Sequence, residues 1–487
     1  MTANRTLSQR IRAYSTAHPA AIVSIILVVA FLYYWPLLTH GNFNLFHKTW
    51  MGLAFNSMLL HLADGRFDVD PDAILFEGFV RDGKTYSYYG VFFALLRAPL
   101  LILSGLREVN FTLVSCLVAD LIVVYCQARL VMKLFAIHAG PRADALFLPL
   151  LAVAVLAGPQ VYMLRPSIYQ EVSYWALALS YVFVFVLLDT LLLGRPATVG
   201  RFLILALLAG LALLARVSTG IGLYAATIVA LAVLPRAPNV RTARLAIPMV
   251  VLAVFAGATL YVNFMRWGDP LVFMDPHRDI SYEESSNPGA IARIDTYGTF
   301  NFVRLGYGLL YYFVPLWMAH GDDGNLLFHA FRTRTIDMVE LPPASFFITD
   351  PLPIVFALWM LVRLIGRWTA TAMPLTLSLL AFCLAIPGGG MLLYMAYAVR
   401  YRVDFYPAIL FLGLLGVHAY LAEKPKPVER PGAWAWPLAG VGILVAPVLL
   451  LLYYASPFGG RVDDFAREGW IAGYRQHIFA GMSQGGR

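Results

Sequence analysis

Long apolar runs alternate with short polar connections along most of the chain. A helix needs about 20 apolar residues to cross the ~30 Å hydrocarbon core of a bilayer, and many of these runs approach that length. The pattern predicts an all-α polytopic membrane protein with about eleven transmembrane helices. The predicted spans are 20–38, 110–130, 145–163, 170–193, 201–217, 219–234, 244–264, 351–366, 373–390, 404–421 and 433–454.

Two apolar stretches after the first span do not fit a simple crossing. Residues 48–65 are amphipathic and end at Gly65, which predicts a helix lying in the membrane interface. Residues 86–105 are apolar but contain Arg97 and Pro99. A full crossing there would put the basic connections that follow on the outer side, so we expect a half-inserted surface helix.

Composition and charge agree with a membrane protein and set its orientation. Hydrophobic residues make up 60% of the 487 and charged residues 13%, whereas a soluble domain carries about 25% charge. The net charge of +8 comes from basic residues in short connections between apolar runs, which is a topology signal rather than a nucleic-acid surface. The positive-inside rule, by which basic connections stay in the cytoplasm, predicts a cytoplasmic N-terminus. We expect a multi-pass protein of the cytoplasmic (inner) membrane.

This topology divides the chain without adding a separate soluble domain. Residues 1–487 are expected to form a single membrane-embedded unit. Its extracytoplasmic parts would be a first loop at 39–109, which holds the two surface helices, a second large loop at 265–350, and a C-terminal tail at 455–487.

The first loop carries the most acidic stretch, GRFDVDPDAILFEGF at 65–79, with Asp68, Asp70, Asp72 and Glu77. Pro71 favours an extended Asp70, and side chains two apart in an extended segment point the same way. Asp68 and Asp70 should therefore be presented together. Such a pair could raise one carboxyl's pKa, hold a divalent cation or supply a general base, or it could be a solvated acidic turn.

Other outer boundaries carry arginines and tyrosines that suit an anionic, sugar-bearing lipid. Arginine presents a planar fork to phosphate, and tyrosine suits both sugar faces and the headgroup zone. The alternative is that these arginines anchor the protein at the interface. The candidate phosphate contacts are Arg400, Arg402, Arg165, Lys84 and Arg97; the candidate sugar or acceptor contacts are Tyr88, Tyr89, Tyr169 and Asp404; and Glu171 is an additional outer acid.

The order of these elements resembles the GT-C superfamily of membrane glycosyltransferases. A first span is followed by an outer loop with Asp-x-Asp and by interfacial helices with a Tyr-rich, Pro-containing stretch, and the late RYRVDFYP is similar to the Arg-Tyr element near the end of their bundles. The Asp-Glu pair and the Lys-Pro-Pro stretch of the protein-mannosyl and aminoarabinose branches are missing, which leaves donor sugar and acceptor open.

The resemblance implies a transferase that moves a single sugar from a polyprenyl-phosphate donor to a hydroxyl of a glycan, lipid or protein at the outer face of the membrane. Asp68 or Asp70 would be the base of an inverting displacement, Glu171 would match the second outer acid of some members, and Arg400 or Arg402 would contact the lipid phosphate. Asp68 and Asp70 could hold Mg²⁺ or Mn²⁺, although members with lipid monophosphate donors often use no metal.

Two other functions compete with this interpretation. Asp120 lies midway along a predicted span, where an acid is costly and calls for a partner; Arg216 is the candidate. The pair could serve a secondary transporter or a flippase of lipid-linked sugars, or it could simply fix helix packing. A non-catalytic assembly component is the third class. Transporters place polar groups between repeated halves, and the chain has no such repeat.

Overall fold

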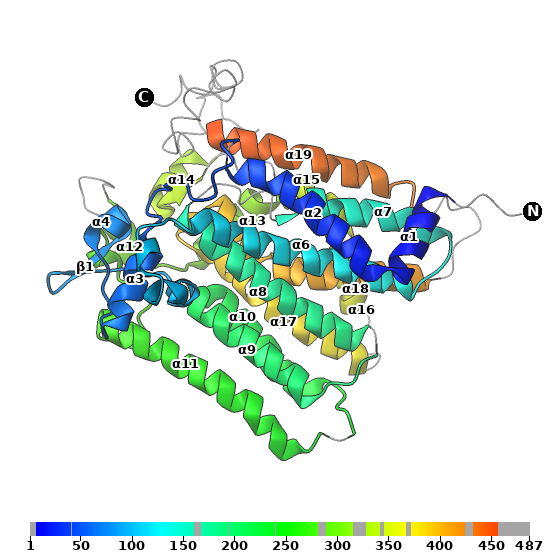
Figure 1. The fold of residues 1–487 in the computed structure, drawn as a ribbon, viewed down its shortest axis with the longest axis horizontal. Coiled ribbons are helices and arrows are strands. Elements are labelled where there is room, and N and C mark those ends of the chain that lie inside the picture. Colours follow the sequence, from blue (N-terminus) through cyan, green and yellow to red (C-terminus); the bar gives the residue numbers. More distant parts are fainter. Residues whose placement is uncertain are drawn as a thin grey trace, which may run out of the picture.

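The computed structural model describes residues 6–39, 41–159, 167–192, 194–238, 240–280, 289–314, 328–340, 345–366, 372–423 and 432–455. Within them the fold is a helical bundle with short elements gathered at one end (Figure 1). The bundle helices are α2 (Pro19–Leu38), α6 (Thr112–Ala136), α7 (Pro141–Leu156), α8 (Ile168–Leu191), α9 (Val199–Ala215), α10 (Val217–Val233), α11 (Ala246–Trp267), α16 (Pro351–Gly366), α17 (Ala372–Leu393), α18 (Tyr406–Ala422) and α19 (Ala435–Ala455).

Each of the predicted spans overlaps one of these helices, with ends that differ by up to seven residues. Residues 160–163 of the span predicted at 145–163 lie outside the described residues. Five helices in the described part of the chain are long and apolar enough to cross a membrane: α2, α6, α8, α11 and α17. The other bundle helices are shorter apolar helices or, like α7, carry charge in the first turn. The structure is therefore that of a helical membrane protein, and the expected count of about eleven crossings remains a prediction.

Packing places α8 at the centre of the bundle, where it contacts α6, α9 and α18. The pairs α9–α10, α10–α17 and α16–α18 extend the bundle to either side, and α11 runs along its edge against α9 (Figure 1). Many large apolar side chains of α11 are exposed, among them Val250, Val254 and Phe264. A face of this kind belongs against lipid.

The helices of the first loop are shorter than the sequence predicts. The interfacial helix expected at 48–65 is α3 (Ala54–Ala63), and Gly65 follows it with a left-handed φ of 73°. Residues 86–105 form no continuous helix but α5 (Phe92–Leu96) and two 3₁₀ turns at Ala98–Leu101 and Ser104–Leu106. The break falls at Arg97 and Pro99, because proline removes a helical donor and Arg97 turns toward a buried carboxylate.

The acidic stretch and the chain after it contain the small elements α4 (Pro71–Ile74), a 3₁₀ turn at Leu75–Glu77, and the antiparallel strands β1 (Phe79–Arg81) and β2 (Lys84–Tyr86). Asp82 and Gly83 both have positive φ, which fits the tight hairpin turn between the strands. A bridge between Phe79 and Asp279 joins this loop to the second large loop.

The second loop contains α12 (Ala290–Tyr297), α13 (Leu305–Phe313), α14 (His329–Thr335), β3 (Met338–Val339) and α15 (Phe346–Thr349). Strand β3 pairs in parallel with β4 (Ala396–Tyr397), which precedes a 3₁₀ turn at Val399–Asp404. Helix α13 directly follows a short 3₁₀ turn at Phe302–Arg304. These loop elements lie at one end of the bundle, called the loop end below (Figure 1).

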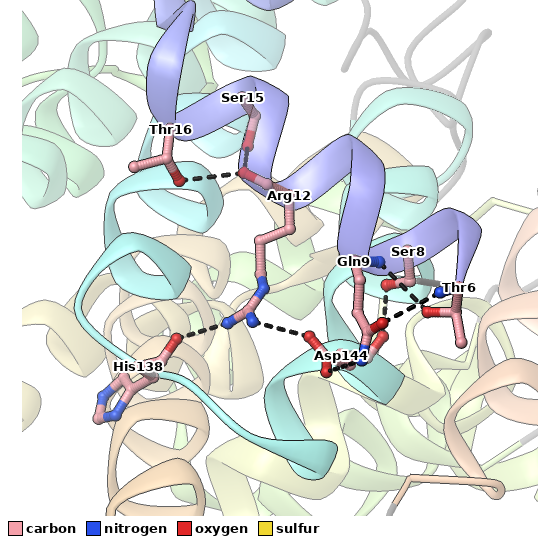
Figure 2. A network of polar contacts seen from close by, with 8 residues as sticks. All are labelled: Thr6, Ser8, Gln9, Arg12, Ser15, Thr16, His138 and Asp144. Carbon is pink, nitrogen blue, oxygen red and sulfur yellow. Dashed lines mark hydrogen bonds and ion pairs between the residues drawn. The ribbon is translucent and has the colours of Figure 1, made fainter. Parts of the chain in front are cut away.

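The opposite end, called the basic end below, is held together by ion pairs between helices. Helix α1 (Leu7–Ala17) docks there through Arg12, whose Nη2 lies 2.8 Å from Asp144 Oδ1 and whose Nη1 donates to the carbonyl of His138 (Figure 2). Gln9 adds a hydrogen bond to the other oxygen of Asp144. Asp189, at the end of α8, accepts from Lys133 and Arg201 in the same way.

Candidate functional site

Asp68 and Asp70 lie on either side of one imidazole. The side chain of Val69 between them is buried, and Asp70 is extended (φ −63°, ψ 130°) before Pro71, as the sequence predicts. Asp68 Oδ1 lies 3.3 Å from Nδ1 of His61, and Asp70 Oδ1 lies 3.2 Å from Nε2 of the same ring. The two carboxylates therefore converge on a histidine of α3 that the sequence analysis did not single out.

Further contacts tie this acid pair to its own loop. Ser57 donates to Asp70 Oδ2 at 2.7 Å and accepts the Asp70 backbone N–H, and Arg66 lies 3.4 Å from Asp68. The Ser57 hydrogen bond, with smaller effects of His61 and Arg66, lowers the pKa of Asp70 below its ordinary value despite partial burial. In the described part of the chain, no group of three or more His, Cys, Asp or Glu side chains is arranged to hold a metal ion.

Glu77 of the same acidic stretch sits in a different environment. The hydroxyl of Tyr169, at the start of α8, donates to its Oε1, and the hydroxyl of Tyr89 donates to Oε2 at 3.4 Å. Desolvation by burial raises the pKa of Glu77 above its ordinary value, although its hydrogen bonds and the charge of Arg400 oppose the rise. The sequence places Glu77 among the loop acids without a role, and its half-buried position depends on residues far along the chain.

Arg400 contacts the same tyrosine, Tyr169, that donates to Glu77. Its guanidinium carbon lies 4.5 Å from the ring centre of Tyr169 and 5.1 Å from that of Tyr401, and Nη1 is 3.7 Å from Glu340 Oε1. Glu340 follows β3, and the pairing of β3 with β4 brings it beside Val399. Its other oxygen accepts the backbone N–H of Val399 at 2.7 Å, which holds the side chain in place. We call Glu77, Tyr89, Tyr169, Arg400 and Tyr401 the Glu77–Arg400 cluster.

Behind the cluster, Asp404 holds Arg216. The distance from Arg216 Nη2 to Asp404 Oδ2 is 2.6 Å, and Ser218 and Thr219 donate to Oδ1 at 2.9 Å each. Arg216 in turn lies 5.3 Å from the ring centre of Tyr401. Asp404, predicted to contact sugar or acceptor, is thus fully buried and fixes the position of the Arg216 side chain.

The predicted pair between Asp120 and Arg216 is wrong, because Arg216 is engaged by Asp404. Asp120 is fully buried in α6, and neither of its carboxylate oxygens has a hydrogen-bond partner among the described residues. The transporter or flippase function and the packing role were both proposed from this pair, so the structure removes the contact on which they rested.

Arg97 and Glu171 bind each other. Nη2 of Arg97 donates to both carboxylate oxygens of Glu171, at 2.6 and 2.8 Å, and the two side chains are 4% and 0% exposed. Arg97 was predicted to contact phosphate and Glu171 to act in catalysis. In the structure, this buried ion pair joins the irregular segment after α5 to the first turn of α8.

Arg402 is buried in a similar way, unlike Arg400. Its Nη2 lies 2.6 Å from Asp350 Oδ2 and 2.9 Å from the hydroxyl of Tyr406, and its side chain is 1% exposed. Of the two arginines in RYRVDFYP, only Arg400 belongs to the Glu77–Arg400 cluster.

The remaining predicted residues are scattered. Lys84 is exposed on β2 beside the hairpin turn. Tyr88 stacks near Tyr89, with ring centres 4.3 Å apart, and so borders the Glu77–Arg400 cluster. Arg165 lies outside the described residues.

Comparison with solved structures gives two similarities, both to the oligosaccharyltransferase of the archaeon Archaeoglobus fulgidus. A crystal structure tethered with an acceptor peptide is 12% identical, with 89% of this chain and 55% of that chain covered and a TM-score of 0.46. The protein AglB in complex with an inhibitory peptide and a dolichol-phosphate is 13% identical, with 89% and 56% covered and a TM-score of 0.45. The chain spans about half the length of these structures. No family model and no curated protein matches the sequence.

Proposed function

We propose that this protein is a membrane glycosyltransferase of GT-C type that moves one sugar from a polyprenyl-phosphate donor to a hydroxyl of a glycan, lipid or protein. The observation that carries the proposal is the Glu77–Arg400 cluster at the loop end. It combines a guanidinium suited to phosphate, tyrosine rings suited to sugar faces, and a half-buried carboxylate suited to proton transfer.

The chemistry needs few groups. A polyprenyl phosphate is a good leaving group, so its departure requires stabilisation of the phosphate charge rather than a strong acid. Arg400 supplies that charge next to Tyr169 and Tyr401. An acceptor hydroxyl attacks the anomeric carbon while a carboxylate of the first loop removes its proton, and a single displacement of this kind inverts the configuration.

The direct test uses purified protein in lipid with a panel of radiolabelled polyprenyl-phosphate hexoses and pentoses and with extracted membrane glycans, lipids and proteins as acceptors. We expect time-dependent transfer from at least one donor, and no transfer by heat-denatured protein. Wild-type protein that is folded but inactive across the whole panel would refute the proposed function.

We also propose that the loop end is extracytoplasmic and the basic end cytoplasmic. The support is the placement of Arg12 in α1 and of Arg142, Arg201 and Arg363 in the terminal turns of α7, α9 and α16 at the basic end, where the positive-inside rule expects basic residues. The exposed Arg107 lies at the loop end and the exposed Arg195 at the basic end.

The orientation predicts which of two introduced cysteines is accessible. Arg107→Cys should react with a membrane-impermeant maleimide in intact cells, and Arg195→Cys only after permeabilisation. The native Cys116, Cys126 and Cys383 are buried and free, so wild-type protein is the unlabelled control. The reverse labelling pattern would place the cluster on the cytoplasmic side and contradict this orientation.

A further inference from the structure

We propose that Glu77, rather than either acid of the Asp-x-Asp pair, accepts the proton of the acceptor hydroxyl; this inference rests on the proposed function. The assignment starts from position. Glu77 is the acidic side chain of the 65–79 stretch that accepts a hydrogen bond from Tyr169, the ring against which Arg400 lies, and it feels the charge of that arginine, which is proposed to bind phosphate. A general base must lie within hydrogen-bond reach of the proton that it removes, so position is the first criterion and pKa the second.

The carboxylate of Glu77 is oriented and still has capacity to accept a proton. Tyr169 binds one oxygen and Tyr89 the other, which fixes the plane of the group. An ionised carboxylate offers about four lone-pair sites, so two tyrosine contacts leave positions for an incoming hydroxyl. Tyr169 contacts both charged groups: its hydroxyl donates to this carboxylate, and its ring face lies against the guanidinium of Arg400. A donor bound at the cluster would have the guanidinium of Arg400 for its phosphate and the carboxylate of Glu77 for the acceptor proton within one group of contacting side chains.

Asp68 and Asp70 are engaged elsewhere. Both contact His61, and Asp70 also holds Ser57 through two hydrogen bonds. The lowered pKa of Asp70 makes it a weaker base than an ordinary aspartate, and its side chain is 62% exposed to solvent. The acid pair and His61 are therefore suited to shaping the loop before Pro71.

The electrostatic environment of Glu77 supports the same role. Burial raises the pKa of Glu77. A general base is most effective when its pKa lies near the working pH, so this rise favours the role. The groups that oppose this rise face it from the hairpin side, from α8 and from the turn after β4; they are Tyr88, Tyr89, Tyr169 and Arg400. Because burial outweighs them, the carboxyl titrates above the ordinary range of glutamate.

The transfer step then balances without a further reactant. The acceptor oxygen forms a bond to the anomeric carbon as its proton moves to a carboxylate oxygen of Glu77. The bond from that carbon to the phosphate oxygen breaks, and its electron pair leaves with the polyprenyl phosphate beside Arg400. Deprotonation of Glu77 to solvent afterwards restores the base.

The experiment compares Glu77→Gln, Glu77→Asp, Asp68→Asn and Asp70→Asn in the transfer assay, with Asp72→Asn as control, because Asp72 is an exposed acid of the same loop. Thermal midpoints in detergent verify folding of each variant. We expect Glu77→Gln to lower kcat by about 10²–10⁴-fold with little change in the KM for donor. Glu77→Asp should recover part of that loss, and Asp72→Asn should match wild type.

A pH profile separates proton transfer from a structural role. The base must be ionised, so wild-type activity should rise with pH through the raised pKa of Glu77. This limb should remain in Glu77→Asp and disappear from the residual activity of Glu77→Gln. Full activity of Glu77→Gln, or loss of transfer confined to Asp68→Asn or Asp70→Asn, would overturn the inference while leaving the proposed function intact. Absence of transfer by wild type would overturn both.

Discussion

Glu171→Gln should destabilise the folded protein by about 3–5 kcal/mol, because it leaves the guanidinium of Arg97 buried without its carboxylate. Arg97→Met should cost less, since a stranded carboxylate can be neutralised by a proton whereas a guanidinium keeps its charge. The measurement is the free energy of unfolding, or the thermal midpoint, in one detergent at one pH.

The double variant Arg97→Met/Glu171→Leu is the matched control for this pair. Replacing both partners of a buried ion pair by apolar side chains is often neutral or stabilising, so the double variant should be more stable than Glu171→Gln. A Glu171→Gln protein with unchanged stability but no transfer would contradict the structural role and support the catalytic role that the sequence predicts.

The helices of the bundle could be predicted because span length and apolar pattern are local properties of the chain. Each predicted span has its helix, from α2 to α19, with small errors at the ends. The segment after α5 could be predicted only in part, because Pro99 is a local signal for a break whereas the ion pair of Arg97 joins residues 74 positions apart. The sequence shows that Arg97 is unusual in an apolar run, but it does not show which acid the guanidinium reaches.

The candidate site shows the same division between local and distant determinants. The extended backbone at Asp70 follows from Pro71, and the structure has it. The partner of Arg216 is Asp404, 188 positions away, rather than the intramembrane Asp120. Glu77 becomes a half-buried carboxylate because the start of α8 and the turn after β4 bring Tyr169 and Arg400 to its surroundings.

Arg400→Gln should lower kcat/KM for transfer by about 10²–10³-fold, roughly 3–4 kcal/mol, the usual effect of removing a donor that stabilises developing negative charge. Arg400→Lys keeps the charge but loses the planar fork that lies against Tyr169 and Tyr401, so it should recover only part of the rate. Arg107→Gln removes an exposed arginine from the same end of the bundle and should leave the rate unchanged. Transfer by Arg400→Gln within threefold of wild type would remove this arginine from the reaction, and Arg402, which is committed to Asp350, offers no second guanidinium in its place.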